Sequence, residues 1–278
     1  MMIAKRQMPS ESMPKALCAL RALQPMTEKN RISAVLHAFI RETGALLFGE
    51  RRCLVCSALI APMQRKALSL CPVCTGAMPR REKGLCPLCG EAAAWPDLPL
   101  APCGRCLRAA PPWSAFVCHG PHEGLLRHLL IRLKFGGQIH LGPLLGALLA
   151  AHPLCVHLQP DLITPIPLHP KRLNERGYNQ TQLLARPLAA ALQRPLAPQL
   201  LQRVKESAPQ TGADRETRLR NLHRVFAADN KVCGKHILLV DDTMTTGATL
   251  AEATRCLLAA GANQVSVAVV SRTTRYWR

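Results

Sequence analysis

Eight cysteines in the first half of the chain carry the clearest chemistry, because they form four pairs with the spacing Cys-x-x-Cys. Two thiolates separated by two residues can hold one metal ion from a tight turn, and two such turns complete a tetrahedral sulfur site that suits Zn²⁺. Four thiolates leave no open coordination position, so we expect structural zinc, with two ions in all. The pairs are Cys53 and Cys56, Cys71 and Cys74, Cys86 and Cys89, and Cys103 and Cys106.

The spacing favours a sequential arrangement, in which the first pair joins the second and the third pair joins the fourth. An interleaved arrangement stays open, because the gaps between the pairs are of similar length. Iron–sulfur clusters and disulfides are further alternatives, although a reducing compartment favours metal ligation. The other cysteines are interpreted as small core or surface residues.

A second group of reactive residues lies near the C-terminus, in the run His236-Ile-Leu-Leu-Val-Asp-Asp-Thr-Met-Thr-Thr-Gly-Ala-Thr249. We expect a buried strand that ends in two carboxylates, then a Thr/Gly loop, and then a helix. The first N–H groups of that helix and its dipole favour a phosphate. The carboxylates can accept hydrogen bonds from ribose hydroxyls, directly or through Mg²⁺, and can steady positive charge that develops on a ribose ring.

This run therefore predicts a ribose-phosphate site. A simpler alternative is an aspartate that merely caps the next helix, but it accounts for one carboxylate and not for two with three threonines and a glycine. The candidate catalytic residues are Asp241 and Asp242. The candidate phosphate-binding residues are Thr243, Met244, Thr245, Thr246, Gly247, Ala248 and Thr249.

Basic residues follow an earlier predicted strand, where they can receive a pyrophosphate leaving group. We interpret residues 167–172 as a loop after that strand, and arginine contacts phosphate oxygens through paired donors. Each basic residue taken alone is equally well explained as a solvated loop charge. The candidates, together with two amides at a predicted helix start, are Lys171, Arg172, Arg176, Asn179 and Gln180.

The elements that must position these groups alternate between strands and helices in the second half of the chain. We predict strands at 115–119, 161–168, 235–242 and 264–273, and helices at 124–135, 141–151, 179–192 and 248–260. This alternation favours an α/β fold, with a parallel sheet and flanking helices on both faces. The predicted organisation is a disordered tail at 1–30, an amphipathic helix at 31–52, a double zinc ribbon at 53–110 and an α/β domain at 111–278.

The composition limits the partners and the compartment. The 278 residues include 36 lysines and arginines against 17 acidic residues, a formal net charge of +19, which favours polyanions such as nucleic acid or phosphorylated small molecules. Aromatic residues make up only 4% of the chain, so stacking platforms for single-stranded DNA are few. We see no apolar run that predicts a membrane span or a signal peptide, and we expect a cytoplasmic protein.

The acid-and-loop run resembles the phosphoribosyl-pyrophosphate-binding motif of type I phosphoribosyltransferases. Together with the four Cys pairs, over roughly residues 53–273, the chain resembles the ComF family, particularly its GntX-like four-knuckle branch. The Arg-Gly-Tyr-Asn-Gln run at 176–180 is similar to a box of that family, and Lys134-Phe135 is similar to the pair that ends its first helix. Its second basic segment is matched by Lys205, Gln210, Arg218 and Asn221.

The resemblance implies a type I phosphoribosyltransferase-like sheet and binding of phosphoribosyl pyrophosphate, or a related ribose phosphate, with Mg²⁺. It also implies a link to DNA uptake in competence or to DNA utilisation. We favour an enzyme, a glycosyltransferase of the phosphoribosyltransferase class with an unknown acceptor. The alternative is a non-catalytic nucleic-acid-binding or adaptor protein of the DNA-uptake machinery, whose partners are single-stranded DNA or DNA-uptake proteins.

Overall fold

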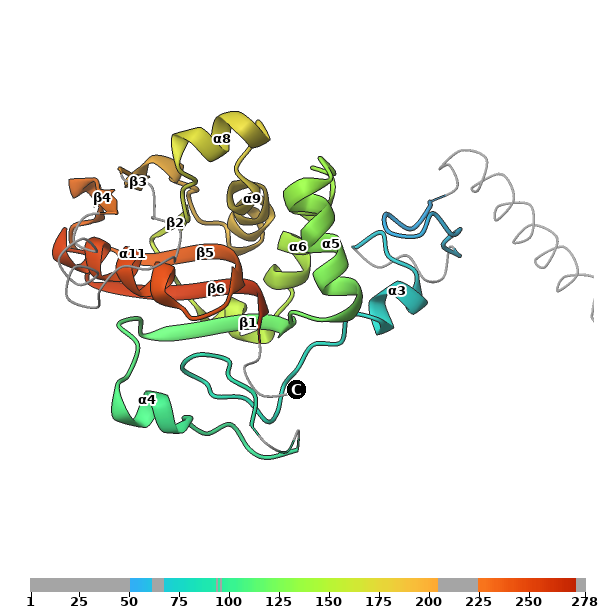
Figure 1. The fold of residues 1–278 in the computed structure, drawn as a ribbon, viewed down its shortest axis with the longest axis horizontal. Helices are drawn as coiled ribbons and strands as arrows, with labels where there is room; N and C mark the ends of the chain where they lie inside the picture. Colours follow the sequence, from blue (N-terminus) through green and yellow to red (C-terminus); the bar gives the residue numbers. More distant parts are fainter. Residues whose placement is uncertain (1–50, 62–67, 94, 96, 205–224, 274–278) are drawn as a thin grey trace, which may run out of the picture. The chain divides into compact units, whose positions relative to one another are not determined.

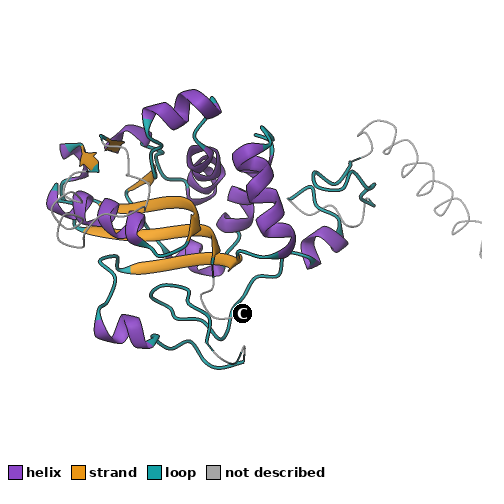
Figure 2. Ribbon diagram, in the orientation of Figure 1, coloured by secondary structure: helices purple, strands orange, loops and turns teal. Residues whose placement is uncertain are grey.

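The fold is built on a sheet of four parallel strands in the order β1–β6–β5–β2 (Figure 1; Figure 2). These strands are β1 (Ala115–Pro121), β2 (Leu162–Pro165), β5 (His236–Met244) and β6 (Gln264–Arg272). The computed structural model describes residues 51–61, 68–93, 95, 97–204 and 225–273, and every described element lies in the compact unit Arg52–Arg278. The predicted tail at 1–30 and nearly all of the predicted helix at 31–52 lie outside the described residues.

Parallel pairing brings the carboxyl ends of the strands to one edge of the sheet. Pro165 of β2 pairs with Val240 of β5, so the chain leaves β2 beside the acidic pair. Thr243 of β5 and Gly120 of β1 both pair with Ser271 of β6. Ligands of open α/β sheets bind outside this edge, which is where the candidate site lies.

Helices cover both faces of the sheet, as the alternating pattern predicts. Three of them share a buried core on one face, and the fourth belongs to the core of the other face. They are α5 (Gly124–Phe135), α6 (Leu141–Ala150) and α9 (Gln180–Leu192) on the first face and α11 (Ala248–Ala259) on the second. Helices α6 and α9 pack closely because Gly146 has no side chain: a Cβ there would lie 2.2 Å from the Leu184 carbonyl oxygen. The α/β fold class is confirmed.

Two predicted boundaries near the site are wrong. Strand β5 does not end at the acidic pair but continues to Met244, because its pairing with β6 extends that far. The predicted loop at 167–172 contains the start of a helix, α8 (Pro170–Arg176). Proline is well suited to a first helical turn. At the helix start, the His169 ring accepts a hydrogen bond from the backbone N–H of Lys171.

Short elements that the sequence pattern did not predict surround this frame. A small antiparallel sheet of two strands lies on the α11 side, where its buried residues join the same core. The additional elements are α7 (Pro153–His157), η2 (Pro198–Leu200), β3 (Leu201–Arg203), β4 (Phe226–Ala228) and η3 (Asn230–Val232). Within the described ranges, no helix combines the length and the apolarity needed to cross a bilayer.

The cysteine-rich segment consists of two similar modules, the first ribbon (residues 52–79) and the second ribbon (residues 84–108). In each module, the backbone N–H of the first cysteine donates to the carbonyl five residues later. The carbonyl of the same cysteine accepts the backbone N–H four residues later. The bonds are Cys53 N to Ala58 O and Ser57 N to Cys53 O, then Cys86 N to Glu91 O and Gly90 N to Cys86 O. A short helix carries the last cysteine of each module, α3 (Pro72–Gly76) and α4 (Gly104–Arg108).

The two ribbons join different cores. Cys53, Leu70 and Met78 of the first ribbon belong to the buried cluster that contains α5, α6 and α9. Cys86 and Cys89 of the second ribbon belong to the cluster that contains α11. The ribbons are therefore parts of the same folded unit as the sheet, and each one extends one of its two cores.

Candidate functional site

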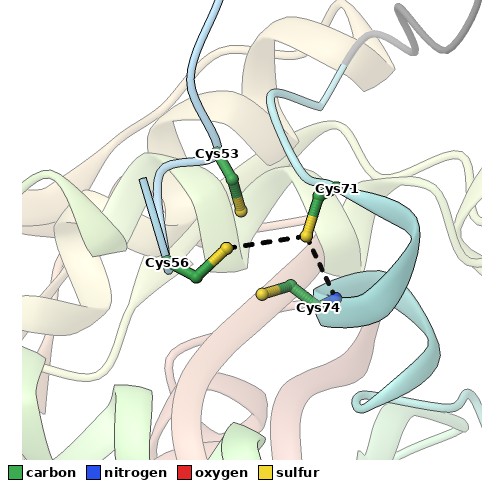
Figure 3. A group of neighbouring side chains, drawn as sticks. All are labelled: Cys53, Cys56, Cys71 and Cys74. Carbon is green, nitrogen blue, oxygen red and sulfur yellow. Dashed lines mark hydrogen bonds between the residues drawn. The ribbon is translucent and has the colours of Figure 1, made fainter. Parts of the chain in front are cut away.

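The eight paired cysteines form two groups of four, and the sulfur atoms of each group lie within 4.8 Å of one another. The first group, from the first and second pairs, points its sulfurs toward a common centre (Figure 3). The second group combines the third and fourth pairs. The sequential arrangement is confirmed, and the interleaved one is wrong. The described cysteines are free thiols, so the disulfide alternative is also wrong for them.

Both groups fit a four-coordinate zinc site. Zn–S bonds of about 2.3 Å in a tetrahedron require sulfur atoms about 3.8 Å apart. The Sγ atoms of Cys56 and Cys71 are 3.6 Å apart, and those of Cys89 and Cys103 are 3.7 Å apart. The backbone N–H of Cys74 donates to the Cys71 sulfur at 3.4 Å. The two four-cysteine sites can therefore bind structural zinc.

Each quartet contains one thiol that ionises near neutral pH. Burial raises the pKa of Cys53, but hydrogen bonds from the backbone around Cys71 and Cys56 outweigh burial and lower the pKa to about 6. In the second quartet, burial again opposes hydrogen bonds from Cys106, and the pKa of Cys103 is lowered to about 7. A thiolate in each ribbon suits a metal cation.

The adjacent residues Asp241 and Asp242 face opposite sides of the sheet, because side chains alternate along a strand. Leu239 packs in the α11 core, and Val240 packs in the core of α5, α6 and α9. Asp242 therefore continues the side of the three helices, where it is only 3% exposed. Asp241 continues the α11 side, where Arg203 of β3 acts on it electrostatically.

Asp242 is held by two side chains from different helices. Lys134 at the end of α5 forms an ion pair with Oδ1 at 2.8 Å, and Gln180 at the start of α9 donates to Oδ2 at 2.8 Å. Lys134 also donates to the Thr243 hydroxyl at 3.5 Å, and Arg176 donates to the Gln180 side-chain oxygen. This chain of polar contacts brings together residues that are distant in sequence.

The pKa of the Asp241 carboxyl is strongly raised. Burial, followed by the neighbouring charge of Asp242, raises the pKa of Asp241 to about 8. Its Oδ1 accepts the backbone N–H of Asp242 at 2.8 Å, which opposes that rise. At neutral pH Asp241 is therefore largely protonated, and a cation that binds here must displace a proton.

The phosphate loop (Thr245 to Gly247) joins β5 to α11. Gly247 is the N-cap of α11 with a φ of 82°, a conformation that favours glycine, and it provides no side-chain cap for the first turn. The Thr246 hydroxyl accepts the Ala248 amide at 3.2 Å. Thr245, Thr246, Ala248 and Thr249 are exposed, whereas the Met244 side chain is buried and belongs to the core.

Two of the three predicted basic residues, Arg172 and Arg176, line a cavity of about 520 Å³ between the end of α5 and α8. The Arg176 guanidinium lies 5.5 Å from the ring centre of Phe135, and Arg172 is exposed on α8. Lys171 is exposed on the same helix and lies outside this lining. The lining residues are Lys134, Phe135, Gly137, Arg172, Glu175, Arg176 and Tyr178. The cavity shares Lys134 with the Asp242 contacts, but its lining includes neither aspartate nor the phosphate loop.

Asn179 and Tyr178 act on the structure around the site rather than in it. The Asn179 side chain caps α9 by accepting the Thr181 amide at 3.1 Å and donates to the Ile166 carbonyl at 3.1 Å. Tyr178 donates its hydroxyl hydrogen to the Leu133 carbonyl. The Asn179 side chain thus fixes the start of α9, and its role as a candidate site residue stays a prediction.

Two polar residues near the site, His122 after β1 and Ser271 in β6, were not predicted from the sequence. The His122 ring nitrogen Nδ1 lies 2.9 Å from the Ser271 hydroxyl, which donates to Thr243 at 3.2 Å. Burial, with the charges of Lys134 and Arg127, lowers the pKa of His122. The available signal was that His122 lies three residues after the strand predicted at 115–119, near the sheet edge where the acidic pair lies. The second basic segment, with Lys205 and Arg218, lies outside the described residues.

Comparison with known proteins agrees with this geometry. The phosphoribosyl transferase domain family matches residues 182–277. The DNA utilization protein YhgH of Salmonella typhimurium is 37% identical over 226 residues, which cover 80% of this chain and 90% of that protein. Competence protein F of Haemophilus influenzae is 33% identical over 176 residues, covering 59% of this chain and 76% of that protein. Competence protein ComFC of Bacillus subtilis is 39% identical over 100 residues, covering 36% and 39%.

A parallel sheet with a phosphoribosyltransferase-type acid-and-loop segment, joined to two four-cysteine ribbons, defines a phosphoribosyltransferase-fold protein with a paired zinc-binding module. Within that class, the chain belongs to the ComF family.

Proposed function

We propose that the chain binds phosphoribosyl pyrophosphate, or a related ribose phosphate, with Mg²⁺ at the carboxyl ends of β5 and β2. The observation that carries the proposal is the α11 N-terminus, whose N-cap Gly247 has no side chain to cap the first turn and which follows a strand bearing two aspartates through a short loop. In this proposal the phosphate loop with Ala248 and Thr249 holds the 5′-phosphate. Asp241 and Asp242 hold the ribose and its metal, because Mg²⁺ prefers carboxylate and phosphate oxygens.

The pyrophosphate end of the ligand would lie against the basic cavity. Arg172, Arg176 and Lys134 supply positive charge there, and arginine can contact phosphate oxygens through two donors. Lys134 is already paired with Asp242, so a bound pyrophosphate would draw the lysine away from that carboxylate and release it for the ribose. Lys171 would add charge from the exposed side of α8.

We further propose catalysis of phosphoribosyl transfer. The bond between ribose C1 and the pyrophosphate oxygen breaks, a bond from C1 to an acceptor nucleophile forms, and pyrophosphate leaves with the electron pair. The chain's residues would act by positioning the reactants and by stabilising charge on the ribose ring, without a covalent intermediate. The biological role would be DNA utilisation or competence, as in the named relatives, in the cytoplasm.

The test is a thermal-shift titration of zinc-loaded protein with phosphoribosyl pyrophosphate and Mg²⁺. We expect a saturable rise in Tm for the parent, because a ligand that binds only the folded state stabilises it. The double variant Asp241→Asn/Asp242→Asn should lose that rise, whereas Asp97→Asn, at an exposed aspartate of the second ribbon, should keep it. An equal rise in the double variant would show that the site is wrong.

The pKa of Asp241 gives the binding a pH dependence. Mg²⁺ requires the carboxylate, and this group is protonated below a pKa of about 8. Affinity for the Mg²⁺ complex of the ligand should therefore rise between about pH 6.5 and 8.5, with proton release measurable by calorimetry in buffers of different ionisation enthalpy. In the Asp241→Asn variant, whatever affinity remains should change little with pH over that range.

A second candidate function rests on charge. The net charge of +19 suits a nucleic-acid partner, as an adaptor or binding protein of DNA uptake. Binding of single-stranded DNA would then weaken steeply as salt increases. A gel-shift series from low to physiological salt measures this, and no retardation at low salt would reject direct DNA binding.

A further inference from the structure

Arg272, the last residue of β6, connects the second ribbon to the sheet. It is 1% exposed, and its guanidinium forms an ion pair with Glu91 at 2.6 Å. Its Nε also donates to the carbonyl of Cys89 at 3.0 Å. Cys89 is one of the four cysteines of the second quartet, so the guanidinium contacts the backbone of the metal site directly.

The same guanidinium holds the beginning of the phosphate loop. Its Nη1 donates to the carbonyl of Met244 at 3.2 Å and also to the carbonyl of Thr245. A charged donor that is buried and shared between two segments fixes their separation more firmly than a neutral one. Arg272 therefore joins the Cys89 turn of the second ribbon to the start of the phosphate loop.

Two further residues connect the second ribbon with the same loop. Arg105 of α4 donates to the carbonyl of Thr246 at 3.5 Å and interacts with the Cys89 thiol. Trp113 donates its indole N–H to the Leu88 carbonyl at 2.7 Å, and a Cβ at Gly247 would lie 3.5 Å from its ring. The second ribbon thus contacts the phosphate loop directly through Arg105 and indirectly through Arg272 and Trp113, which each contact both.

These contacts determine where the loop amides point. In a planar trans peptide, the C=O of one residue and the N–H of the next point in opposite directions. The carbonyls of Met244 and Thr245 accept the Arg272 guanidinium, and the Thr246 carbonyl accepts Arg105. The Met244 carbonyl also accepts the backbone N–H of Thr273. The N–H groups of Thr245, Thr246 and Gly247 are therefore turned away from the guanidiniums of Arg272 and Arg105.

We propose that Arg272 and Arg105 are positioning residues, through which the folded second ribbon holds the phosphate loop in its anion-binding conformation. The consequence for the ligand rests on the proposed function. The loop conformation itself does not, because it rests on the contacts of Arg272 and Arg105 alone. Loss of the second metal site should loosen the loop, whereas loss of the first should leave it unchanged, because the first ribbon packs in the core of α5, α6 and α9.

The test compares the loop backbone in variants of the two ribbons by ¹⁵N relaxation. Cys106→Ser and Cys74→Ser are matched, because each removes the last cysteine of its quartet, and each of these residues is 6% exposed. We expect the amide order parameters of Thr245, Thr246 and Gly247 to fall from the rigid value of about 0.85 to below about 0.6 in Cys106→Ser. They should stay rigid in Cys74→Ser, with bound zinc counted in both.

Two variants keep the test decisive if Cys106→Ser fails to fold. Arg105→Ala removes a partly exposed contact, and Glu91→Leu/Arg272→Met replaces the buried pair with apolar groups, which folds commonly tolerate. Both should retain two zinc ions and lose loop rigidity, and affinity for ribose 5-phosphate should weaken about tenfold, the effect of one charge-assisted contact.

The outcomes separate this inference from the proposed function. Rigid loop amides in all second-ribbon variants, or equal loosening in Cys74→Ser, would overturn the positioning role. Loosening confined to the second-ribbon variants supports it, even if the parent binds neither ribose 5-phosphate nor phosphoribosyl pyrophosphate. That last result would count against the proposed function alone.

Discussion

The first turns of the two ribbons share one backbone but differ in their surroundings. Ser57 and Ala58 of the first ribbon are exposed, whereas the equivalent Gly90 and Glu91 of the second ribbon are buried. Gly90 lies against Phe116, where a Cβ would be 2.6 Å from the ring, and Glu91 pairs with Arg272. The four sulfur ligands specify the turn, and the flanking residues decide whether it meets solvent or the sheet.

This difference shows that equal cysteine spacing does not give equal roles. A site of four cysteines specifies a compact turn wherever it occurs. Only the second ribbon has an acid, a glycine and an arginine placed to contact the phosphate loop and the end of β6, among the described residues. Substitutions at equivalent positions of the two ribbons should therefore have unequal effects, and the following predictions test that inequality.

The largest effect is expected for Glu91→Ala. Removing the carboxylate leaves the Arg272 charge buried without its acidic partner, which typically destabilises by about 3–5 kcal/mol. The equivalent change in the first ribbon, Ala58→Ser, should alter the free energy of unfolding by no more than about 0.5 kcal/mol, because Ala58 is exposed. Urea denaturation of the zinc-loaded proteins measures both values, and similar losses would remove the distinction between the ribbons.

A smaller loss is expected for Gly90→Ala. The residue has a φ of 65° and the new methyl group would meet the Phe116 ring, so overpacking should cost about 1–3 kcal/mol. Ser57→Ala changes the equivalent position of the first ribbon, where the side chain is exposed, and should be nearly neutral. Calorimetric unfolding of the two variants checks the ranking. A Gly90→Ala protein as stable as the parent would mean that the second ribbon is less tightly seated than its contacts imply.

At the proposed ligand site, the ionisation of Asp241 should make the free energy of unfolding depend on pH. The pKa of Asp241 is raised in the fold to about 8 from an ordinary value of 3.8, so the fold favours the protonated acid. The stability that this group contributes is complete below about pH 4 and is lost as pH rises through about 8. Asp241→Asn should therefore gain stability relative to the parent at about pH 9 compared with about pH 5.5.

Denaturation curves at the two pH values measure this gain, with Asp97→Asn as the control. Asp97 is an exposed residue of the second ribbon, so its variant should follow the parent at both values. Parallel behaviour of Asp241→Asn and the parent would show that Asp241 ionises normally.

The smallest effect is expected for Ser57→Gly. Ser57 has a φ of 61°, which is unfavourable for a residue with a Cβ, and the equivalent residue of the second ribbon is already glycine. The substitution should stabilise the protein by up to about 1 kcal/mol. A differential scanning measurement against the parent suffices, and destabilisation would indicate that the Ser57 side chain makes a contact of its own.

The sequence predicted the parts of the molecule that depend on local pattern. The cysteine quartets follow from spacing, and the strands and main helices follow from apolar periodicity and from stop signals such as Gly261. The strand, loop and helix of the acid-and-loop run were predicted in the right order. The predicted strand was two residues too short, because pairing with β6 rather than composition decides where β5 ends.

Contacts between distant segments could not be predicted in this way. Lys134 and Gln180 hold Asp242, yet in sequence they look like a helix-end charge and a helix-start amide. No sequence pattern singles out Glu91, and Arg272 lies near the end of the predicted strand at 264–273. Their pairing depends on how the second ribbon lies against the sheet, which single-sequence periodicity does not encode. Helix α8 was missed because none of its residues is buried, so it has no apolar stripe.

The pairing of Glu91 with Arg272 also has a consequence for biosynthesis. The two residues are 181 positions apart, and the strand that carries Arg272 is the last of the sheet. At a synthesis rate of about 5–20 residues per second, the second ribbon leaves the ribosome roughly 10–40 s before its partner strand. During that interval, the apolar surface around Cys86 and Cys89, which joins the α11 core in the folded chain, would be exposed to solvent. Nascent chains should therefore be vulnerable to aggregation at this ribbon until the final strand is added.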